Sequence, residues 1–446
     1  GGEPNGDLGM NVDLGGTTHT QLGYGAPAVT ENGTVYVGDS QGWLTSVDST
    51  TGLINWQVDV GLDISKASLT VASDGTIYVV ESSVPSRLHA YTPAGVKKWT
   101  VALGSTASQS TPALSADQSM IYVGGVGLYA VSRFGTVDWI ASEVGTVPSS
   151  PVVGPDGRIY ALNNLGRLYK IQDNAGFGAG YAVQGVYMGT GSVLAGSPVM
   201  SPSGDRVYIL LLNKMYAIRT SDMTLDPTFQ GTGVGDGPGV SSLGGGFTNH
   251  TPAVSADGVV YVGSTDTYVY AVGPDGVIDW KYKTGGYLGG QPAIADDGSL
   301  YFGSMDDYLY KMANKPSGGT GAAPPAVNWP LFGRFDEHTG LGGAAVDPSP
   351  VEAFRVYAGI GLAVKTPVID ELGNVYFTAG RYLMSVNGSS GGVNWQYDLG
   401  ATGAPLGYAA PAVSANGHIY VAAQNGVLHA VNRDSGLADW TVKLGA

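Results

Sequence analysis

The chain has 446 residues, among them 71 glycines and 26 tyrosines, and only 13% of its residues are charged. This composition is typical of short strands joined by tight turns, not of a helical protein. The formal net charge of −15 would repel a phosphate backbone, so nucleic acid is not an expected partner. The chain contains no cysteine, which excludes disulfides within it, thiolate metal sites and cysteine nucleophiles. No apolar run approaches the roughly 18 residues that a membrane-spanning helix needs.

The first twenty residues are polar and rich in glycine, and we expect them to form a flexible lead. They contain no basic segment followed by an apolar one, the pattern of an export signal. A lead of this kind resembles the tether that follows the lipidated cysteine of a bacterial lipoprotein. A lipid anchor in the native precursor is therefore a hypothesis that mass spectrometry of the native protein would decide.

One unit recurs along residues 21–446. A short apolar segment, usually led by proline, is followed by a turn with Asp or Asn and Gly, and then by a strand centred on tyrosine. The clearest copies lie at 27–38 and 252–263. Nine copies are marked by Tyr36, Tyr78, Tyr122, Tyr160, Tyr208, Tyr261, Tyr301, Tyr376 and Tyr420.

Each copy contains enough strand signals for four strands. A second short strand follows the tyrosine by about eight to ten residues, and a further strand carries a tryptophan in most copies. The copies begin near residues 27, 68, 112, 151, 198, 252, 292, 367 and 411. Most of these intervals match the roughly 40 to 50 residues of a propeller blade. A single four-stranded sheet cannot bury both of its faces, whereas a ring of such sheets can.

The segment 46–56 reads Ser-Val-Asp-Ser-Thr-Thr-Gly-Leu-Ile-Asn-Trp. It resembles the tryptophan-docking motif of PQQ-like repeats, Ala-x-Asp-x-x-Thr-Gly-x-x-x-Trp, and related segments recur in most copies. Copies four and five lack the tryptophan, and copy seven has only Trp329 after an insertion. The resemblance implies an all-β fold, a single propeller of four-stranded blades. It also implies a structural docking role for Trp56, Trp99, Trp139, Trp280, Trp395 and Trp440.

The blade number is open between nine and eight, and we favour nine. Eight would require one copy, in the irregular stretch 176–250 or the 313–366 insertion, to lie outside the ring. Within the propeller we expect irregular insertions at about 221–248 and 313–350. The string at 329–340 is similar to one that often opens such propellers, yet here it lies inside the chain. We therefore expect the C-terminal repeat to join the N-terminal one, so that the Trp440 strand meets the segment before Pro27.

Propellers of this resemblance include quinone-dependent dehydrogenases, which hold their quinone against a disulfide of adjacent cysteines. No such pair exists here, so we expect no cofactor, no metal site and no enzymatic activity. His89 and His429 occupy slots that hold tyrosine in sibling copies, which favours packing over metal binding. Asp39, Asp266, Asp306 and Asp307 follow the tyrosine strands and either form a ring of carboxylates or cap tight turns, and we favour turns.

Surface recognition remains as the expected activity. The candidate binding residues are aromatic or histidine side chains near a propeller face: Trp43, Tyr24, Tyr287, Tyr408 and His250. Packing between blades is the alternative for each. We predict an extracytoplasmic binding or scaffolding protein (periplasmic, cell-surface or secreted) that docks a protein partner, similar to the propeller lipoproteins of outer-membrane protein assembly. A carbohydrate-binding or carbohydrate-active propeller is the alternative, and a quinone-dependent dehydrogenase is the second alternative.

Overall fold

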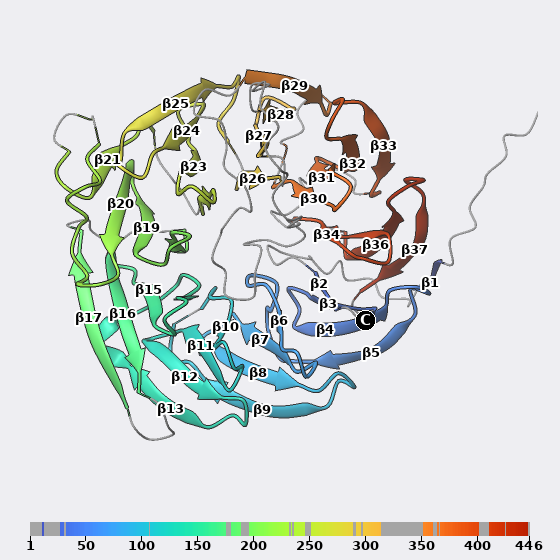
Figure 1. Cartoon of the computed structure of the whole chain (residues 1–446). Helices are drawn as coiled ribbons and strands as arrows, with labels where there is room; N and C mark the ends of the chain where they lie inside the picture. Colours follow the sequence, from blue (N-terminus) through green and yellow to red (C-terminus); the bar gives the residue numbers. More distant parts are fainter. Residues whose placement is uncertain are drawn as a thin grey trace, which may run out of the picture.

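Nine four-stranded antiparallel sheets stand in a ring around a central axis (Figure 1). The computed structural model describes residues 11–12, 27–30, 33–106, 108–174, 180–188, 196–231, 233, 236–245, 251–288, 291–295, 298–313, 351–359, 364, 366–400, 410–423 and 425–444. The predicted nine-bladed propeller is confirmed, and the eight-blade alternative is wrong. Within the described residues, the 310 turn Ser142–Val144 is the only helical element, and no helix could span a membrane.

The strands run outward from the axis in chain order within each blade. Blades 1 to 3 contain β2 Ala28–Val29, β3 Thr34–Gly38, β4 Trp43–Asp48, β5 Ile54–Asp59, β6 Thr70–Val71, β7 Ile77–Glu81, β8 Arg87–Tyr91, β9 Lys97–Ala102, β10 Ala113–Leu114, β11 Met120–Gly124, β12 Leu128–Ser132 and β13 Val137–Ala141. Blades 4 to 6 contain β14 Val152–Val153, β15 Ile159–Leu162, β16 Arg167–Asp173, β17 Tyr181–Tyr187, β18 Val199–Met200, β19 Arg206–Leu211, β20 Lys214–Arg219, β21 Val240–Ser242, β22 Ala253–Val254, β23 Val260–Gly263, β24 Tyr268–Val272 and β25 Ile278–Lys283. Blades 7 to 9 contain β26 Ala293–Ile294, β27 Leu300–Gly303, β28 Tyr308–Ala313, β29 Val351–Tyr357, β30 Val368–Ile369, β31 Asn374–Ala379, β32 Tyr382–Asn387, β33 Val393–Asp398, β34 Ala412–Val413, β35 His418–Ala422, β36 Val427–Asn432 and β37 Ala438–Lys443.

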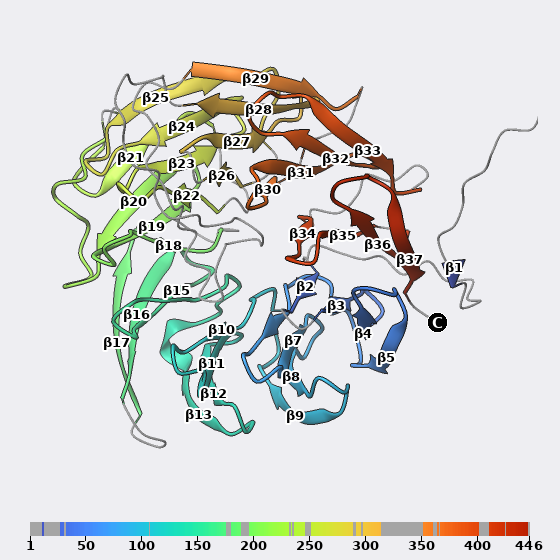
Figure 2. The same ribbon diagram turned by 45° about the vertical axis from the view of Figure 1, so that its right-hand side comes forward.

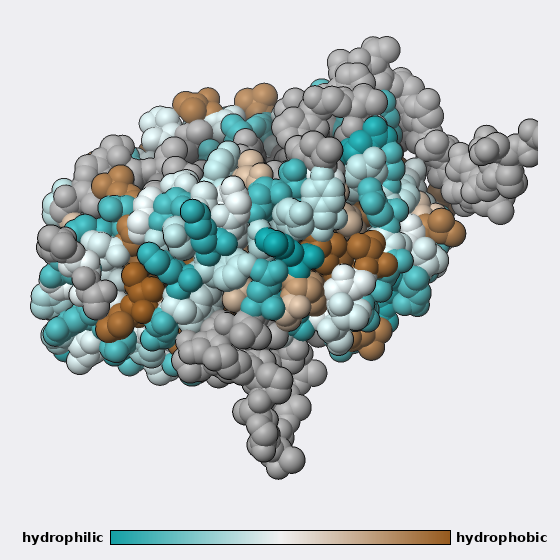
Figure 3. All heavy atoms as spheres, turned by 90° about the horizontal axis from the view of Figure 1, so that it is seen from above, coloured by the Kyte–Doolittle hydropathy of each residue, from teal (hydrophilic) through white to brown (hydrophobic). Residues whose placement is uncertain are grey.

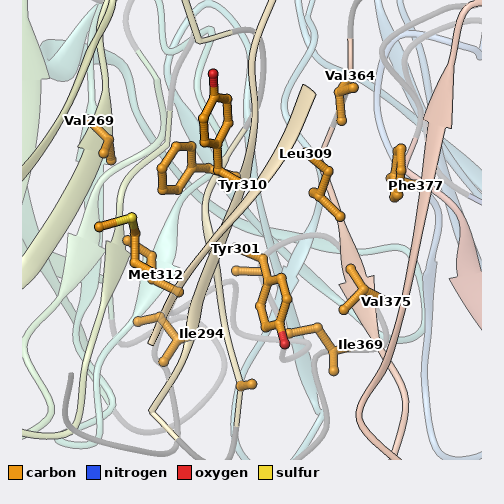
Figure 4. Packing of buried hydrophobic residues seen from close by; sticks show 14 of the residues in the cluster. Val269, Ile294, Tyr301, Leu309, Tyr310, Met312, Val364, Ile369, Val375 and Phe377 are labelled. Carbon is orange, nitrogen blue, oxygen red and sulfur yellow. The ribbon is translucent and has the colours of Figure 1, made fainter. Parts of the chain in front are cut away.

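The core lies between neighbouring blades. Figure 4 shows one cluster, in which Val269 of blade 6 and Phe377 of blade 8 flank the side chains of blade 7. The nine repeat tyrosines all lie in the second strands and are buried. In eight blades the tyrosine ring also lies within 6.5 Å of an aromatic ring of the same blade, such as Trp440 for Tyr420. The repeat tyrosine is therefore the packing centre of each blade.

The ring closes between blade 9 and blade 1, as expected. The indole N–H of Trp440 and the hydroxyl of Tyr420 both donate to the backbone oxygen of Ser49, at 3.0 and 3.1 Å. Strand β1 (Asn11–Val12) adds to the outer edge of blade 9 by pairing in parallel with β37 (Figure 2). The segment before Pro27 thus meets the Trp440 strand, and two residues of the expected flexible lead belong to a sheet.

The docking tryptophans pack each blade onto the next one. The ring of Trp440 lies so close to Gly52 that a Cβ atom there would come within 2.3 Å of it. Because Gly52 also has a φ of +71°, only glycine fits without strain. The same contact joins Trp56 to Gly95, Trp99 to Gly135 and Trp395 to Gly436. In these blades a bulge in the outer ladder comes just before the tryptophan and turns it toward the next blade.

The indole N–H of a docked tryptophan donates to a backbone oxygen two or three residues before the receiving glycine. Examples are Trp56 to Pro93 at 2.8 Å, Trp99 to Arg133 at 3.0 Å and Trp395 to Arg433 at 2.7 Å. Trp139 departs from this rule, because its indole donates to the carboxylate of Asp173 at 2.8 Å. Each of these docks therefore combines aromatic packing with one hydrogen bond between blades, whereas the indole nitrogen of Trp280 has no hydrogen-bond partner in the described part of the chain.

Blades 4, 5 and 7 have no tryptophan in their outer strands, and a cation makes the corresponding hydrogen bond. The ammonium groups of Lys170 and Lys311 donate to the backbone oxygens of Thr220 and Gly388, and the guanidinium of Arg206 donates to that of Pro274. All three acceptors hold the position that receives the indole N–H elsewhere. The aromatic contact is also replaced, because Phe229 packs on Gly276 and Phe354 packs on Gly391.

A second set of contacts joins the blades near the axis. The backbone N–H before the first strand of one blade donates to the Ser or Thr hydroxyl at the same position in the next blade. The pairs are Ser68 to Thr111 at 3.2 Å, Thr111 to Ser150 at 3.0 Å, Ser150 to Ser197 at 3.2 Å and Gln291 to Thr366 at 3.2 Å. These hydroxyls satisfy backbone donors that cannot join a ladder, so the inner ends of the blades are held in register.

Candidate binding face

The propeller has two faces, which differ in the connections they carry. The connections between second and third strands, and those from blade to blade, lie at one end of the sheets, which we call the loop face. The remaining connections lie at the other end, the turn face. This follows from the antiparallel order of strands in every blade. Trp43 and Tyr287 both belong to the loop face.

Trp43 is structurally equivalent to Tyr268 and Tyr308, as the sequence predicts. Each residue begins the third strand of its blade. Its backbone oxygen accepts a hydrogen bond from the N–H of the residue directly after the second strand, which is Asp39, Ser264 or Ser304, respectively. Tyr382 begins β32 and has the same register with its outer strand. These residues are all half-buried, so part of each ring is accessible from the loop face.

Cationic side chains from the same blades cover several of these rings. Lys281 lies 4.8 Å from the ring centre of Tyr268, Arg355 lies 5.4 Å from that of Tyr308, and Arg381 lies 5.8 Å from that of Tyr382. The ring centre of the exposed Tyr357 is 5.3 Å from that of Tyr308. We call Trp43, Tyr268, Tyr308, Tyr357 and Tyr382 the aromatic arc.

Tyr287 lies in the connection between blades 6 and 7 and is 48% exposed. Its backbone oxygen accepts a hydrogen bond from the N–H of Met305, at 2.9 Å, which fixes the connection to the start of blade 7. No ring contact between Tyr287 and the aromatic arc occurs in the described part of the chain. Tyr287 and Trp43 therefore belong to one face but are not brought together in one cluster.

Asp266 and Asp306 fix the connections between the second and third strands of blades 6 and 7 at the loop face. Each carboxylate accepts a hydrogen bond from the backbone N–H two residues on, which is the turn geometry expected from the sequence. The other carboxylate oxygen accepts from the hydroxyl of Tyr270 or Tyr310. Burial and this hydrogen bond raise the pKa of both tyrosines, so they remain neutral donors.

Asp39 does not correspond to Asp266 and Asp306, and this part of the sequence interpretation is wrong. The backbone hydrogen bonds align Asp39 with Ser264, two positions earlier in the connection. Its buried carboxylate accepts from the N–H groups of Gln41 and Trp43, both at 2.9 Å. Burial raises the pKa of Asp39. A ring of equivalent carboxylates is thus not formed, and no group of three metal-ligating side chains occurs within the described ranges.

The two histidines in tyrosine slots are buried, as the sequence predicts. The ring of His89 contacts the carboxylate of Glu81 at 3.1 Å and the hydroxyl of Thr100 at 3.0 Å. His429 contacts the hydroxyl of Tyr397 at 3.2 Å, and burial lowers its pKa to about 4. Both histidines serve the packing of the loop-face half of their blades.

Three candidate residues, Tyr24, Tyr408 and His250, lie outside the described residues, as does the segment 314–350 with Trp329. Sequence reasoning missed Tyr357 and Tyr382. The signal for Tyr382 was present, because it begins a third strand directly after a glycine turn, as Trp43 does. Tyr357 follows an insertion and had no repeat partner by which to place it.

A model of the outer membrane protein assembly factor BamB family matches residues 4–209. This match agrees with the nine four-stranded blades and with the repeated tryptophan contacts between them. The chain is a PQQ-like repeat propeller. No curated protein matches it.

Two solved structures show that the fold of this PQQ-like propeller is shared. BamB from Moraxella catarrhalis is 14% identical, with a TM-score of 0.52 over 82% of this chain and 93% of that chain. Dihydro-heme d1 dehydrogenase NirN, in complex with DHE, is 11% identical, with a TM-score of 0.55 over 84% of this chain and 77% of that chain. At such low identity the likeness concerns the fold alone.

Proposed function

We propose that this PQQ-like propeller is a non-enzymatic scaffold that docks a protein partner on its loop face. The observation that carries the proposal is the aromatic arc, in which half-buried tyrosines lie beside Lys and Arg side chains. Tyr, Trp and Arg supply most of the binding energy at protein interfaces. A ring of blades also holds its connections rigidly, which lowers the entropy lost on binding.

The family match supports a protein partner and a location outside the cytoplasm, because the matching family is described as an outer membrane protein assembly factor. A periplasmic, cell-surface or secreted protein with a lipid anchor in its precursor is the arrangement we propose. Fractionation of the source cells, with mass spectrometry of the native N-terminus, tests it. Recovery of the unlipidated protein in the cytoplasmic fraction would contradict it.

The docking proposal is tested with a Tyr287→Ala/Tyr357→Ala variant, since both rings are 48% exposed and their loss should not unfold the protein. Cross-linking in intact cells should identify a protein partner whose yield falls at least about tenfold in the variant, the equivalent of roughly 1.4 kcal/mol of binding energy. Phe134→Ala is the matched control, because Phe134 is 74% exposed on the turn face. Equal yields from both variants would contradict a loop-face docking site.

The exposed ring of Tyr287 also suits stacking on a sugar, which keeps carbohydrate binding as the alternative. A glycan array separates the two functions. Binding to a glycan that is lost in Tyr287→Ala and retained in Phe134→Ala would favour the carbohydrate alternative. For the dehydrogenase alternative, a thermal shift on adding quinone and calcium would be the supporting result.

A further inference from the structure

The outer strand of blade 4, β17, differs from the other outer strands. Its seven residues pair with β16 without a register shift, and the sheet ends at β17. Its sequence, Tyr-Ala-Val-Gln-Gly-Val-Tyr, contains neither a charged residue nor a proline. In Figure 1 it is the long green strand on the outside of the ring.

Every other outer strand is protected against pairing with another chain. Seven of them, β5, β9, β13, β25, β29, β33 and β37, contain a bulge in the ladder and at least one charged residue. The eighth, β21, has only three residues. Bulges, charges and short length are the means by which natural sheets keep an edge from adding a strand. Figure 3, which views the molecule from above Figure 1, shows hydrophilic residues interrupted by a few hydrophobic patches.

The loss of protection at β17 follows from the repeat itself. In seven outer strands the bulge stands next to the docking aromatic, which it turns toward the next blade. Blade 4 docks through Lys170 of β16 instead, so its outer strand needs no bulge. The same change that removed the tryptophan left a straight, uncharged edge.

Two backbone hydrogen bonds at the ends of β17 show which of its backbone groups point outward. The N–H of Asn174 donates to the oxygen of Gly180 at 3.1 Å, and the N–H of Met188 donates to that of Gly166 at 3.5 Å. In an antiparallel ladder the bonded pairs alternate. The even-numbered residues between Gly180 and Met188 therefore face β16, and the N–H groups of Val183 and Gly185 point away from the sheet.

Strand addition to an outer edge already occurs in this molecule. Strand β1 pairs in parallel with β37, so the outer strand of a blade accepts an extended segment even where the edge is bulged and charged (Figure 2). The edge of β17 offers a longer ladder without those obstacles. A second copy of the chain is a poor occupant, because each copy carries a formal charge of −15.

We propose that β17 binds an extended, uncharged segment of a partner protein, which adds to blade 4 as a fifth strand. Backbone hydrogen bonds from Val183 and Gly185 supply the affinity in this mode of recognition. Tyr187, which is 52% exposed at one end of β17, favours a β-branched side chain beside it in the added strand. This site lies on the rim and does not depend on the loop-face proposal.

The test uses a capped peptide, Thr-Val-Thr-Val-Thr-Val-Thr, as the probe, with the same peptide N-methylated at every residue, which blocks both of its edges, as the control. Amide exchange of the intact protein is followed by NMR. The unmodified peptide should slow exchange at Val183 and Gly185 by at least about tenfold, and the N-methylated peptide should not. Equal protection by both peptides, or by neither, overturns the proposal.

A pair of variants locates the binding. Ala182→Lys/Gln184→Lys places two charges on exposed positions of β17, and Asn394→Lys/Gln396→Lys places two on exposed positions of β33. The first variant should weaken peptide binding at least about tenfold and the second should not, because charges protect a straight edge. Concentration-dependent protection without peptide would show that a second copy is the occupant, which also overturns the proposal.

Discussion

The interfaces between blades fall into two kinds, and their comparison shows what the repeat requires. Where blade 9 meets blade 1, an indole packs on glycine and donates to a backbone oxygen. Where blade 7 meets blade 8, a phenylalanine packs on glycine and a buried lysine donates to the equivalent oxygen. The receiving site is thus constant, while the group that fills it varies. The physical requirement is a donor for a carbonyl that has no ladder partner, plus an apolar cover.

The two kinds of interface differ in cost. An indole is neutral, and its ring supplies the apolar packing around the hydrogen bond. An ammonium group is charged, so its transfer from water into the interface costs free energy. Lys311 reduces that cost by lying 5.4 Å from the ring centre of Tyr301 and 5.7 Å from that of Phe354, although only 5% of it is exposed. For Lys170, burial lowers the pKa, which shows the same opposition to the charged form. We therefore expect tryptophan-docked interfaces to contribute more to stability.

The largest expected effect is at the closure of the ring. Trp440 is 1% exposed, the most buried of the docking tryptophans, so Trp440→Ala should lower the free energy of unfolding by about 3–5 kcal/mol. Trp56→Ala should cost less, because Trp56 is only half-buried. Urea titration of both variants measures the difference. If Trp56→Ala lowered the free energy of unfolding as much as Trp440→Ala does, the interface between blades 9 and 1 would not be more stabilising than the one between blades 1 and 2.

The next largest expected effect is a loss of stability in acid at the tryptophan-docked interface between blades 8 and 9. His429, between blades 8 and 9, has a pKa of about 4 in the folded protein, below its ordinary 6.5. The unfolded chain therefore binds more protons between these values, and stability is lost as pH falls from about 6.5 to 4. At about 1.4 kcal/mol per pKa unit, the loss is at most about 3.5 kcal/mol.

The variant His429→Gln isolates this contribution, since glutamine does not titrate. The difference in unfolding midpoint between wild type and variant should shrink as pH falls from 6.5 to 4. The Arg206 dock remains charged over the whole range and should add nothing to this slope. A constant difference between the two proteins would show that His429 does not titrate in this window.

A cation dock can be exchanged for an indole dock. Lys311→Met removes one donor from the oxygen of Gly388, which keeps the hydroxyl of Tyr301 at 2.9 Å. Because one bond remains and the ammonium no longer needs desolvation, the expected loss is about 1–2 kcal/mol. Adding Phe354→Trp to this variant should recover most of it, since the indole can reach the same oxygen.

The matched control for that exchange is Lys283→Met, which removes an exposed lysine from the neighbouring blade. It should change the free energy of unfolding by less than about 0.5 kcal/mol. If Lys311→Met is neutral or stabilising, the desolvation of the ammonium outweighs its hydrogen bond. The cation would then be tolerated at this interface and would not stabilise it.

The sequence predicted the constant part of the repeat and missed the variable part. Nine buried tyrosines and the tryptophan motif placed the blades, because both recur at a fixed position. The roles of Lys170, Arg206 and Lys311 could not be predicted, since the acceptor of each lies in another blade, about 50 to 77 residues away along the chain. Asp39 was misplaced for another reason, because residue type was followed in place of position: Asp39 stands as far after Tyr36 as Ser264 stands after Tyr261.

The same limit applied to the candidate site. Trp43, Tyr268 and Tyr308 were aligned correctly from their place after a turn, but the covering cations come from the outer strands or an adjacent position. The open edge of β17 could not be recognised before the strand ladders were known. Its distinguishing feature, a missing bulge, is a property of pairing and has no sequence signature of its own.

The smallest expected effect concerns the inner ring of hydroxyls, which both kinds of interface share. Ser150 accepts from Thr111 of the tryptophan-bearing blade 3, and Ser197 accepts from Ser150 of the lysine-docked blade 4. Ser150→Ala and Ser197→Ala each leave one backbone N–H without its acceptor and should each cost about 1 kcal/mol. Near-equal losses in urea titration would show that the inner contacts are independent of the outer dock. A clearly larger loss at Ser197 would instead mean that a blade lacking the indole relies more on its inner hydroxyl, and the two kinds of interface would then differ along their whole depth.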